Sequence, residues 1–186
     1  MEFRYYDIEG VIEVIPDIYR DDRGIFFESF NRDKFLEKGI NLNFVQDNQS
    51  FSKKNVIRGL HFQYPPFDQS KLVRVIYGKA LDVALDIRPD SQTIGKYITC
   101  ILDSDKNNML YMPGGFAHGF LALTDIILFY KCTQVYNKDW EGGIIWNDPE
   151  LAIDWGIPNP VMSQKDKNLP GFSFYKEIIN NKKKII

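Results

Sequence analysis

The chain has 186 residues, 44% of them hydrophobic, and its 23 Lys and Arg nearly balance its 25 Asp and Glu. This predicts one domain over residues 1–186 with a substantial core, and the near-neutral charge argues against binding to nucleic acid. No run approaches the ~18 apolar residues of a membrane helix, and the N-terminus lacks signal-peptide order, so we expect a cytoplasmic protein without membrane contact.

Cysteine and histidine are both scarce. Cys100 and Cys132 lie in apolar, strand-like runs without a CxxC partner, so we expect buried, reduced thiols. His61 and His118 are the only histidines, too few for a site of three imidazoles, and the sequence therefore disfavours zinc or non-haem iron chemistry.

Short runs rich in Val, Ile, Phe and Tyr recur about every ten residues between Gly, Pro, Asp and Asn clusters, which is typical of an all-β fold. In chain order the predicted strands are Ile25–Phe30, Val56–Phe62, Lys71–Tyr77, Leu81–Ile87, Tyr97–Leu102, Met109–Met112, Gly119–Leu123 and Ile126–Tyr136. One helix is predicted over Asn31–Lys38, with Asn31 as N-cap. The count of strands favours a jelly-roll β-sandwich or barrel.

Two connections are also predicted. Gly78 and Lys79 separate two strands and predict a hairpin between them. After Trp155 the strand pattern weakens, which indicates an extended tail or short turns packed on the barrel. Residues 172–186 fit no pattern, and we expect Asn180–Ile186 to fray.

Three places put polar residues into strands that otherwise read as buried. Asp82 and Asp86 share one face of Leu81–Ile87; that face is either solvated or part of a site, and the deeper position of Asp82 favours a site. In Val56–Gln63, Arg58 and His61 fall on opposite faces. They can serve one site only if the strand has a bulge or twist, which Gly59 would permit.

The histidines and tyrosines have two interpretations each. His61 is either structural or catalytic, and the nearby cations Lys71 and Arg74 favour an anion-binding cavity. Tyr130 and Tyr136 share a face and either pack in the core or contact different parts of one elongated ligand. The glycines around His118 suit a tight turn or a ligand-lined loop.

Several strings match one family in order from about Asp17 to Asn168. They are Asp22–Phe30, Phe44–Asn48, Arg58–Gln63, Lys71–Arg74, Gly115–Phe120, Tyr130–Thr133, Glu141–Ile144, Asn147–Pro149 and Ser163–Asp166. On these strings the chain resembles the dTDP-4-dehydrorhamnose 3,5-epimerases. The resemblance implies a cupin-like jelly roll with a few short peripheral helices, and a homodimer in which N-terminal strands contribute to the neighbouring subunit. It implies no metal and no organic cofactor.

The resemblance also implies a reaction and a set of catalytic residues. The substrate would be a dTDP-linked 4-keto-6-deoxyhexose, inverted at C3 and C5 through enolates next to the C4 ketone. His61 would be the base, oriented by Asp166. Lys71 would stabilise the charge on O4, and Tyr130 would return a proton from the opposite face.

The nucleotide sugar would be bound by a larger set of residues. By resemblance these are Arg23, Phe26, Glu28, Gln46, Asn48, Arg58, Asp82, His118, Tyr136, Glu141 and Lys165, with the arginines on the diphosphate. Asp154–Gly156 departs from the Trp-Pro that is common in the family, which puts the placement of Asp166 in doubt. Two alternatives stay open: an epimerase acting at one carbon of a related nucleotide sugar, and a non-catalytic barrel that binds such a sugar.

Overall fold

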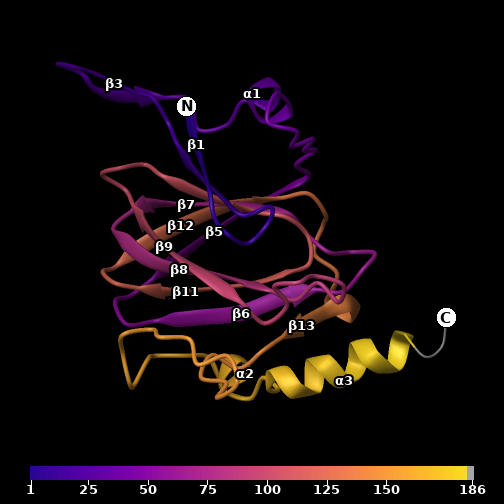
Figure 1. Cartoon of the computed structure of the whole chain (residues 1–186). Coiled ribbons are helices and arrows are strands. Elements are labelled where there is room, and N and C mark those ends of the chain that lie inside the picture. Colours follow the sequence, from indigo (N-terminus) through magenta and orange to yellow (C-terminus); the bar gives the residue numbers. More distant parts are fainter. Residues whose placement is uncertain (184–186) are drawn as a thin grey trace.

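A computed structural model describes residues 1–183 and shows two antiparallel sheets packed face to face (Figure 1). The six-stranded sheet has the order β1 (Glu2–Tyr5), β2 (Ile12–Ile15), β10 (Met109–Met112), β7 (Lys71–Tyr77), β12 (Ile126–Cys132) and β5 (Gln46–Ser52). The five-stranded sheet has the order β13 (Glu141–Gly143), β6 (Ile57–Gln63), β11 (Phe116–Ala122), β8 (Lys79–Asp86) and β9 (Tyr97–Asp103). This is the predicted all-β, jelly-roll class.

The smaller elements lie around the two sheets. The hairpin of β3 (Ile18–Asp21) and β4 (Gly24–Phe27) projects from the same end of the molecule as α1 (Arg32–Leu36), at the upper left of Figure 1. The one-turn helices are η1 (Lys138–Trp140) and α2 (Gln164–Lys167), and α3 (Phe172–Lys183) runs below β6. None of the helices within residues 1–183 has the length and apolar character needed to cross a membrane.

The main core fills the space between the sheets. Side chains alternate along each strand, so Val73 and Leu128 of one sheet face Ala84 and Phe120 of the other. The outer face of the five-stranded sheet is buried as well, because Val83 and its neighbours pack against residues of the C-terminal segment. Both faces of β8 are therefore covered.

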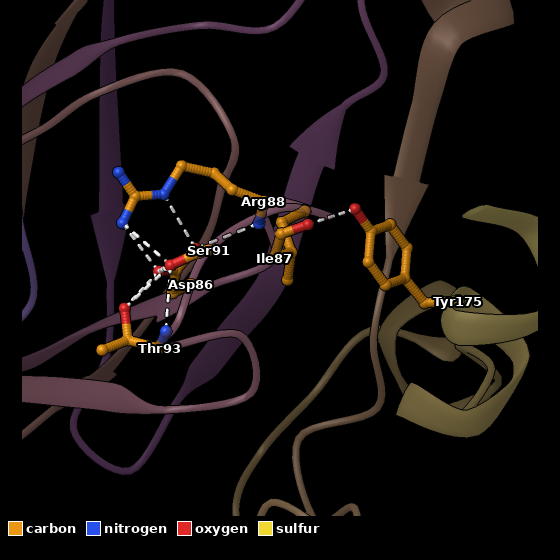
Figure 2. A network of polar contacts seen from close by, with 6 residues as sticks. All are labelled: Asp86, Ile87, Arg88, Ser91, Thr93 and Tyr175. Carbon is orange, nitrogen blue, oxygen red and sulfur yellow. Dashed lines mark hydrogen bonds and ion pairs between the residues drawn. The ribbon is translucent and has the colours of Figure 1, made fainter. Parts of the chain in front are cut away.

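Asp82 and Asp86 are fully buried in consequence, so a solvated face is the wrong interpretation for both. The Asp86 carboxylate accepts hydrogen bonds from Arg88 (2.7 and 2.9 Å), Ser91 (2.6 Å) and Thr93 (2.6 Å), as Figure 2 shows. Burial raises the pKa of Asp86, but these donors outweigh it and leave the pKa below its usual value. The network explains how a carboxylate is tolerated at the end of a core strand.

The predicted hairpin across Gly78 and Lys79 does not form. β7 pairs with β10 and β12, whereas β8 pairs with β9 and β11, so the chain passes from one sheet to the other at Gly78. Gly78 has φ +82°, and a Cβ there would lie 2.2 Å from the Asp125 carbonyl oxygen. A glycine fits this close crossing as well as it fits a hairpin turn, which is why the local pattern misleads.

The other predicted elements are present with shifted ends. β7 and β10 match their predicted ranges, β4 stops at Phe27, and β12 stops at Cys132, so Tyr136 lies beyond the strand. Asn31 caps α1, accepting the N–H groups of Asp33 and Lys34. Both cysteines are buried and unbridged, as predicted.

The C-terminal prediction is partly wrong. The segment after Trp155 does pack on the barrel, but it ends in α3, a helix of 12 residues. α3 is helical through Lys183, and residues 184–186 of the segment that we expect to fray lie outside the described residues. The side chains of Phe172 and Tyr175 are buried and lie on the face of α3 that packs on the barrel.

Candidate active site

A cavity of about 390 Å³ opens between the two sheets. Its walls come from β5, β6, β7, β11, β12 and the α2 segment. The lining residues are Asn48, Gln49, Ser50, Arg58, His61, Lys71, His118, Phe120, Tyr130, Ser163, Lys165 and Asp166. All four candidate catalytic residues are among them.

His61 and Asp166 form a hydrogen-bonded pair. His61 Nε2 lies 2.8 Å from Asp166 Oδ1, although the residues are 105 positions apart. Ser163 caps the turn α2 and accepts the N–H of Asp166, which holds the carboxylate at the cavity wall. Burial raises the pKa of Asp166, but the bonds from His61, the Gly59 N–H and Ser163 outweigh it and lower the pKa below its usual value.

This pairing decides which ring nitrogen of His61 is free. An ionised carboxylate only accepts hydrogen bonds, so Nε2 carries the proton that is shared with Asp166. Nδ1 then keeps its lone pair. His61 is partly exposed at the cavity, so the Nδ1 of a neutral ring can act as a general base there.

Arg58 and His61 reach the same cavity because β6 is irregular. The β11–β6 register shifts between His118 and Phe120, opposite the stretch from Arg58 to His61. Gly59 has φ +118°, and a Cβ there would lie 2.5 Å from the Gly119 Cα. This register shift is the kind of bulge or twist that a shared site for Arg58 and His61 requires, and it lies at Gly59.

Lys71 supplies a buried positive charge. The residue is 7% exposed, and no salt bridge to it forms within residues 1–183. Burial lowers its pKa, while Cys132, its cross-strand partner on β12, and the more distant Asp82 act in the opposite direction. An uncompensated ammonium in a cavity wall can stabilise negative charge that develops on a bound oxygen.

Tyr130 faces the cavity from the sheet opposite His61. It lies on β12, whereas His61 lies on β6. Burial raises the pKa of Tyr130, so its hydroxyl stays protonated and can donate a proton. His61 and Tyr130 therefore place an imidazole and a phenol on opposing walls of the cavity.

His118 is held from behind by Asp82. His118 Nε2 lies 2.9 and 3.0 Å from the two oxygens of Asp82, which is fully buried. Asp82 does not line the cavity itself, and its carboxylate contacts the lining residue His118.

Three more candidates lie at the cavity margin. Gln46 donates to Asn48 Oδ1 (3.0 Å) and accepts the Tyr136 N–H (2.8 Å). The Tyr136 hydroxyl donates to Glu141 (3.0 Å), which also pairs with Lys165 (2.6 Å). These contacts form a polar rim that joins β5, the loop after β12 and α2.

Arg23, Phe26 and Glu28 are not brought to the cavity within one chain. Arg23 lies at the turn of the β3–β4 hairpin with a side chain 90% exposed, and Phe26 is 73% exposed. Glu28 pairs with Lys34 beside α1. The hairpin projects away from the barrel (Figure 1).

The sequence analysis did not select four lining residues: Gln49, Ser50, Phe120 and Ser163. Ser163 was detectable, because Ser-x-x-Asp is a common N-cap pattern and the cap positions Asp166. Gln49 and Ser50 belong to β5, a strand whose inward residues are polar, so no apolar alternation marked it.

The family model for dTDP-4-dehydrorhamnose 3,5-epimerase matches residues 5–173. The enzyme of that name from Escherichia coli K12 is 48% identical over 166 residues, covering 88% of this chain and 90% of the relative. A crystal structure of the Legionella pneumophila 3,5-epimerase in complex with dTDP-4-keto-L-rhamnose is 40% identical, with TM-score 0.88, and covers 92% and 93% of the two chains.

A 3'-monoepimerase from Streptomyces bikiniensis in complex with dTDP-quinovose is also similar. It is 31% identical with TM-score 0.88, covering 93% of this chain and 89% of that one. The family model matches most of the length, and several relatives of that name are more than 40% identical. This chain therefore belongs to the dTDP-4-dehydrorhamnose 3,5-epimerase family.

Proposed function

We propose that this chain is an isomerase that inverts C3 and C5 of dTDP-4-dehydro-6-deoxy-D-glucose to give dTDP-4-dehydro-L-rhamnose. The observation that carries the proposal is the placement of His61 and Tyr130 on opposing walls of one cavity that is also lined by the buried Lys71. Inversion of a carbon needs an acceptor and a donor on its two faces, because removal and return on the same face would restore the original configuration.

The reaction follows from the C4 ketone. His61 Nδ1 removes the proton from the carbon next to the ketone, and the bonding electrons pass into an enolate whose charge lies on O4. Lys71 stabilises that oxyanion. Tyr130 then donates its proton to the opposite face of the carbon, O4 becomes a ketone again, and proton exchange with water restores His61 and Tyr130. The same steps serve C3 and C5, which both flank C4.

The rest of the cavity binds the nucleotide diphosphate. We assign Arg58 and the rim residues Gln46, Asn48, Tyr136, Glu141 and Lys165 to the nucleotide, since they offer a guanidinium, amides and an exposed ring. Asp82 orients His118 at the cavity wall. The buried, unbridged cysteines agree with a reducing compartment, and we place the reaction in the cytoplasm.

We also propose a homodimer in which the β3–β4 hairpin brings Arg23, Phe26 and Glu28 to the partner's cavity. The hairpin exposes Tyr19, Ile25 and Phe26, which is costly in water unless a second copy covers them. The outer face of the six-stranded sheet has a matching row, since Ile127 pairs with exposed Phe51 and Tyr77. Arg74 on that face has a buried Nε without an acceptor in residues 1–183.

Proton NMR in heavy water tests the reaction. With the wild type, dTDP-4-keto-6-deoxyglucose should take up deuterium at both C3 and C5, and a reductase should trap a rhamnose-configured product. His61→Ala should abolish exchange while nucleotide binding, measured by calorimetry, survives. Tyr130→Phe should slow inversion more than exchange, because His61 can still return a proton to the original face.

The alternatives are read from the same spectra. Exchange at one carbon alone would replace the proposal by a single-carbon epimerase, the class to which the Streptomyces bikiniensis neighbour belongs. Binding without exchange would indicate a non-catalytic barrel that binds a nucleotide sugar.

A further inference from the structure

Asp148 lies outside the cavity, in a string that the catalytic proposal does not use. The residue is 5% exposed, and its carboxylate accepts three backbone N–H groups. Oδ1 accepts from Glu150 (2.9 Å) and Leu151 (3.0 Å), and Oδ2 accepts from Phe172 (2.8 Å). Asp148 thus ties its own loop to the first residue of α3.

Besides the His61–Asp166 and Glu141–Lys165 pairs, the segment that carries Asp166 is attached to the barrel at its two ends. At the start, Val161 exchanges backbone bonds with Asn55 (2.8 Å) and Ile57 (3.0 Å). At the far end, Ile145 donates to the Pro170 carbonyl (2.8 Å), and Phe172 donates to Asp148. Asp166 lies six residues before Phe172, so the second attachment limits how far the carboxylate can move.

The same attachment leads back to His61. Leu60, the residue before His61, exchanges two backbone bonds with Ile144 (3.0 and 3.1 Å). These contacts close a ring of hydrogen-bonded segments around the His61–Asp166 pair. The ring runs from Leu60 to Ile144, through Asp148 to Phe172, and back to Asp166. Both partners of the His61–Asp166 bond are therefore positioned by one loop.

α3 fixes the far side of this ring. Tyr175 is buried, and its hydroxyl donates to the carbonyl of Ile87 at the end of β8, as Figure 2 shows. Its ring contacts Phe62 edge-on at 5.4 Å.

From these contacts we infer that Asp148 is a positioning residue for the proposed reaction: through its bond to Phe172, it sets the distance between Asp166 and His61. The inference rests on the proposed function for its kinetic consequence, but not for its structural one. It assigns Asp148 no contact with substrate.

Asp148→Asn is the sharpest test, because it keeps the shape of the side chain while one of the two acceptor positions becomes a donor. We expect kcat to fall by about 10- to 100-fold with a smaller change in KM, since the misplacement affects the proton transfer rather than nucleotide binding. The loss should largely disappear when Asp166→Asn is already present, because both changes act on the same pair. Losses that simply add would show a merely structural role and overturn the inference.

The two histidines give a readout that does not need turnover. Each ring donates from Nε2 to a carboxylate, His61 to Asp166 and His118 to Asp82. In Asp148→Asn, the Nε2–H proton resonance of His61 should shift or broaden by exchange with water, while that of His118 should stay in place. An unchanged His61 resonance would overturn the inference, even if the wild type proved inactive and the proposed function failed.

Two further variants keep the test decisive if Asp148→Asn unfolds. Gly171→Ala would put a Cβ 2.9 Å from Asp148 Oδ2, a milder displacement that should act in the same direction with a smaller effect. Asp103→Asn is the control: Asp103 is buried, pairs with Lys79 (2.8 Å) and accepts a backbone N–H from Asp105 at a turn that does not line the cavity. It should lower stability without moving the His61 resonance.

Discussion

At the scale of single residues, the cavity combines groups whose environments give them different protonation states. Burial lowers the pKa of Lys71 and raises that of Tyr130, so the ammonium loses its proton at lower pH than a free lysine and the phenol keeps its proton to higher pH than a free tyrosine. The His61–Asp166 bond leaves one ring nitrogen as acceptor. These states match an acceptor, a donor and an oxyanion partner.

The Lys71 ammonium predicts the alkaline side of the pH profile. As pH rises through the lowered pKa of Lys71, the charge that stabilises the oxyanion is lost. The decline of kcat should therefore begin at a pH lower than the pKa of a free lysine, ~10.4. Lys71→Met should reduce kcat by roughly 10²- to 10³-fold and remove that decline. Steady-state kinetics from pH 6 to 10 would test this, with Lys131→Met, on β12 but outside the cavity lining, as control. An unchanged alkaline limb in Lys71→Met would contradict the assignment.

At the scale of elements, the sequence patterns predicted where the strands lie along the chain better than which strands pair with each other. β7 and β10 have their predicted ends because both are apolar runs with clear boundaries. β5 escaped prediction because its inward face, including Gln46, Asn48 and Ser50, is polar where it approaches or lines the cavity. The hairpin at Gly78 failed because pairing in a jelly roll joins strands that are distant in sequence.

The network around Asp86 predicts how the end of β8 responds to pH. Because the folded pKa is lowered, Asp86 contributes stability above its unfolded pKa of about 3.9, and that contribution is lost as pH falls through the lower folded pKa. Asp86→Asn should cost about 1–3 kcal/mol near neutral pH and progressively less in acid. Urea unfolding at several pH values, with the exposed Asp154→Asn as control, would show the trend; a constant difference down to pH 3 would refute it.

At the scale of the whole molecule, three of the predicted binding residues do not lie at the cavity of their own chain. Arg23, Phe26 and Glu28 lie on or near a projecting hairpin rather than at the cavity. The proposed dimer resolves this, because the hairpin of each copy then serves the cavity of the other.

Mixing two impaired variants tests whether each hairpin serves the cavity of the partner subunit. If Arg23 acts in the partner's cavity, Arg23→Ala and His61→Ala should each be impaired alone, and unfolding and refolding them together should restore about a quarter of the wild-type rate. Each mixed dimer would carry one intact cavity. If both residues serve the cavity of their own chain, no intact cavity forms in any mixed dimer and activity stays absent. Light scattering of the wild type should report two chains.

The sequence predicted the all-β class, most strand positions and the helix at Asn31, and its resemblance to the family supplied a set of candidate site residues. These follow from local alternation, capping and matching strings, which depend on near neighbours in the chain. The resemblance paired Asp166 with His61, and the tertiary structure shows that contact; only the tertiary structure places Asp82 behind His118 and joins α3 to the loop of Asp148. Those contacts join residues 24 to 105 positions apart, and their geometry depends on how the sheets pack rather than on any local pattern.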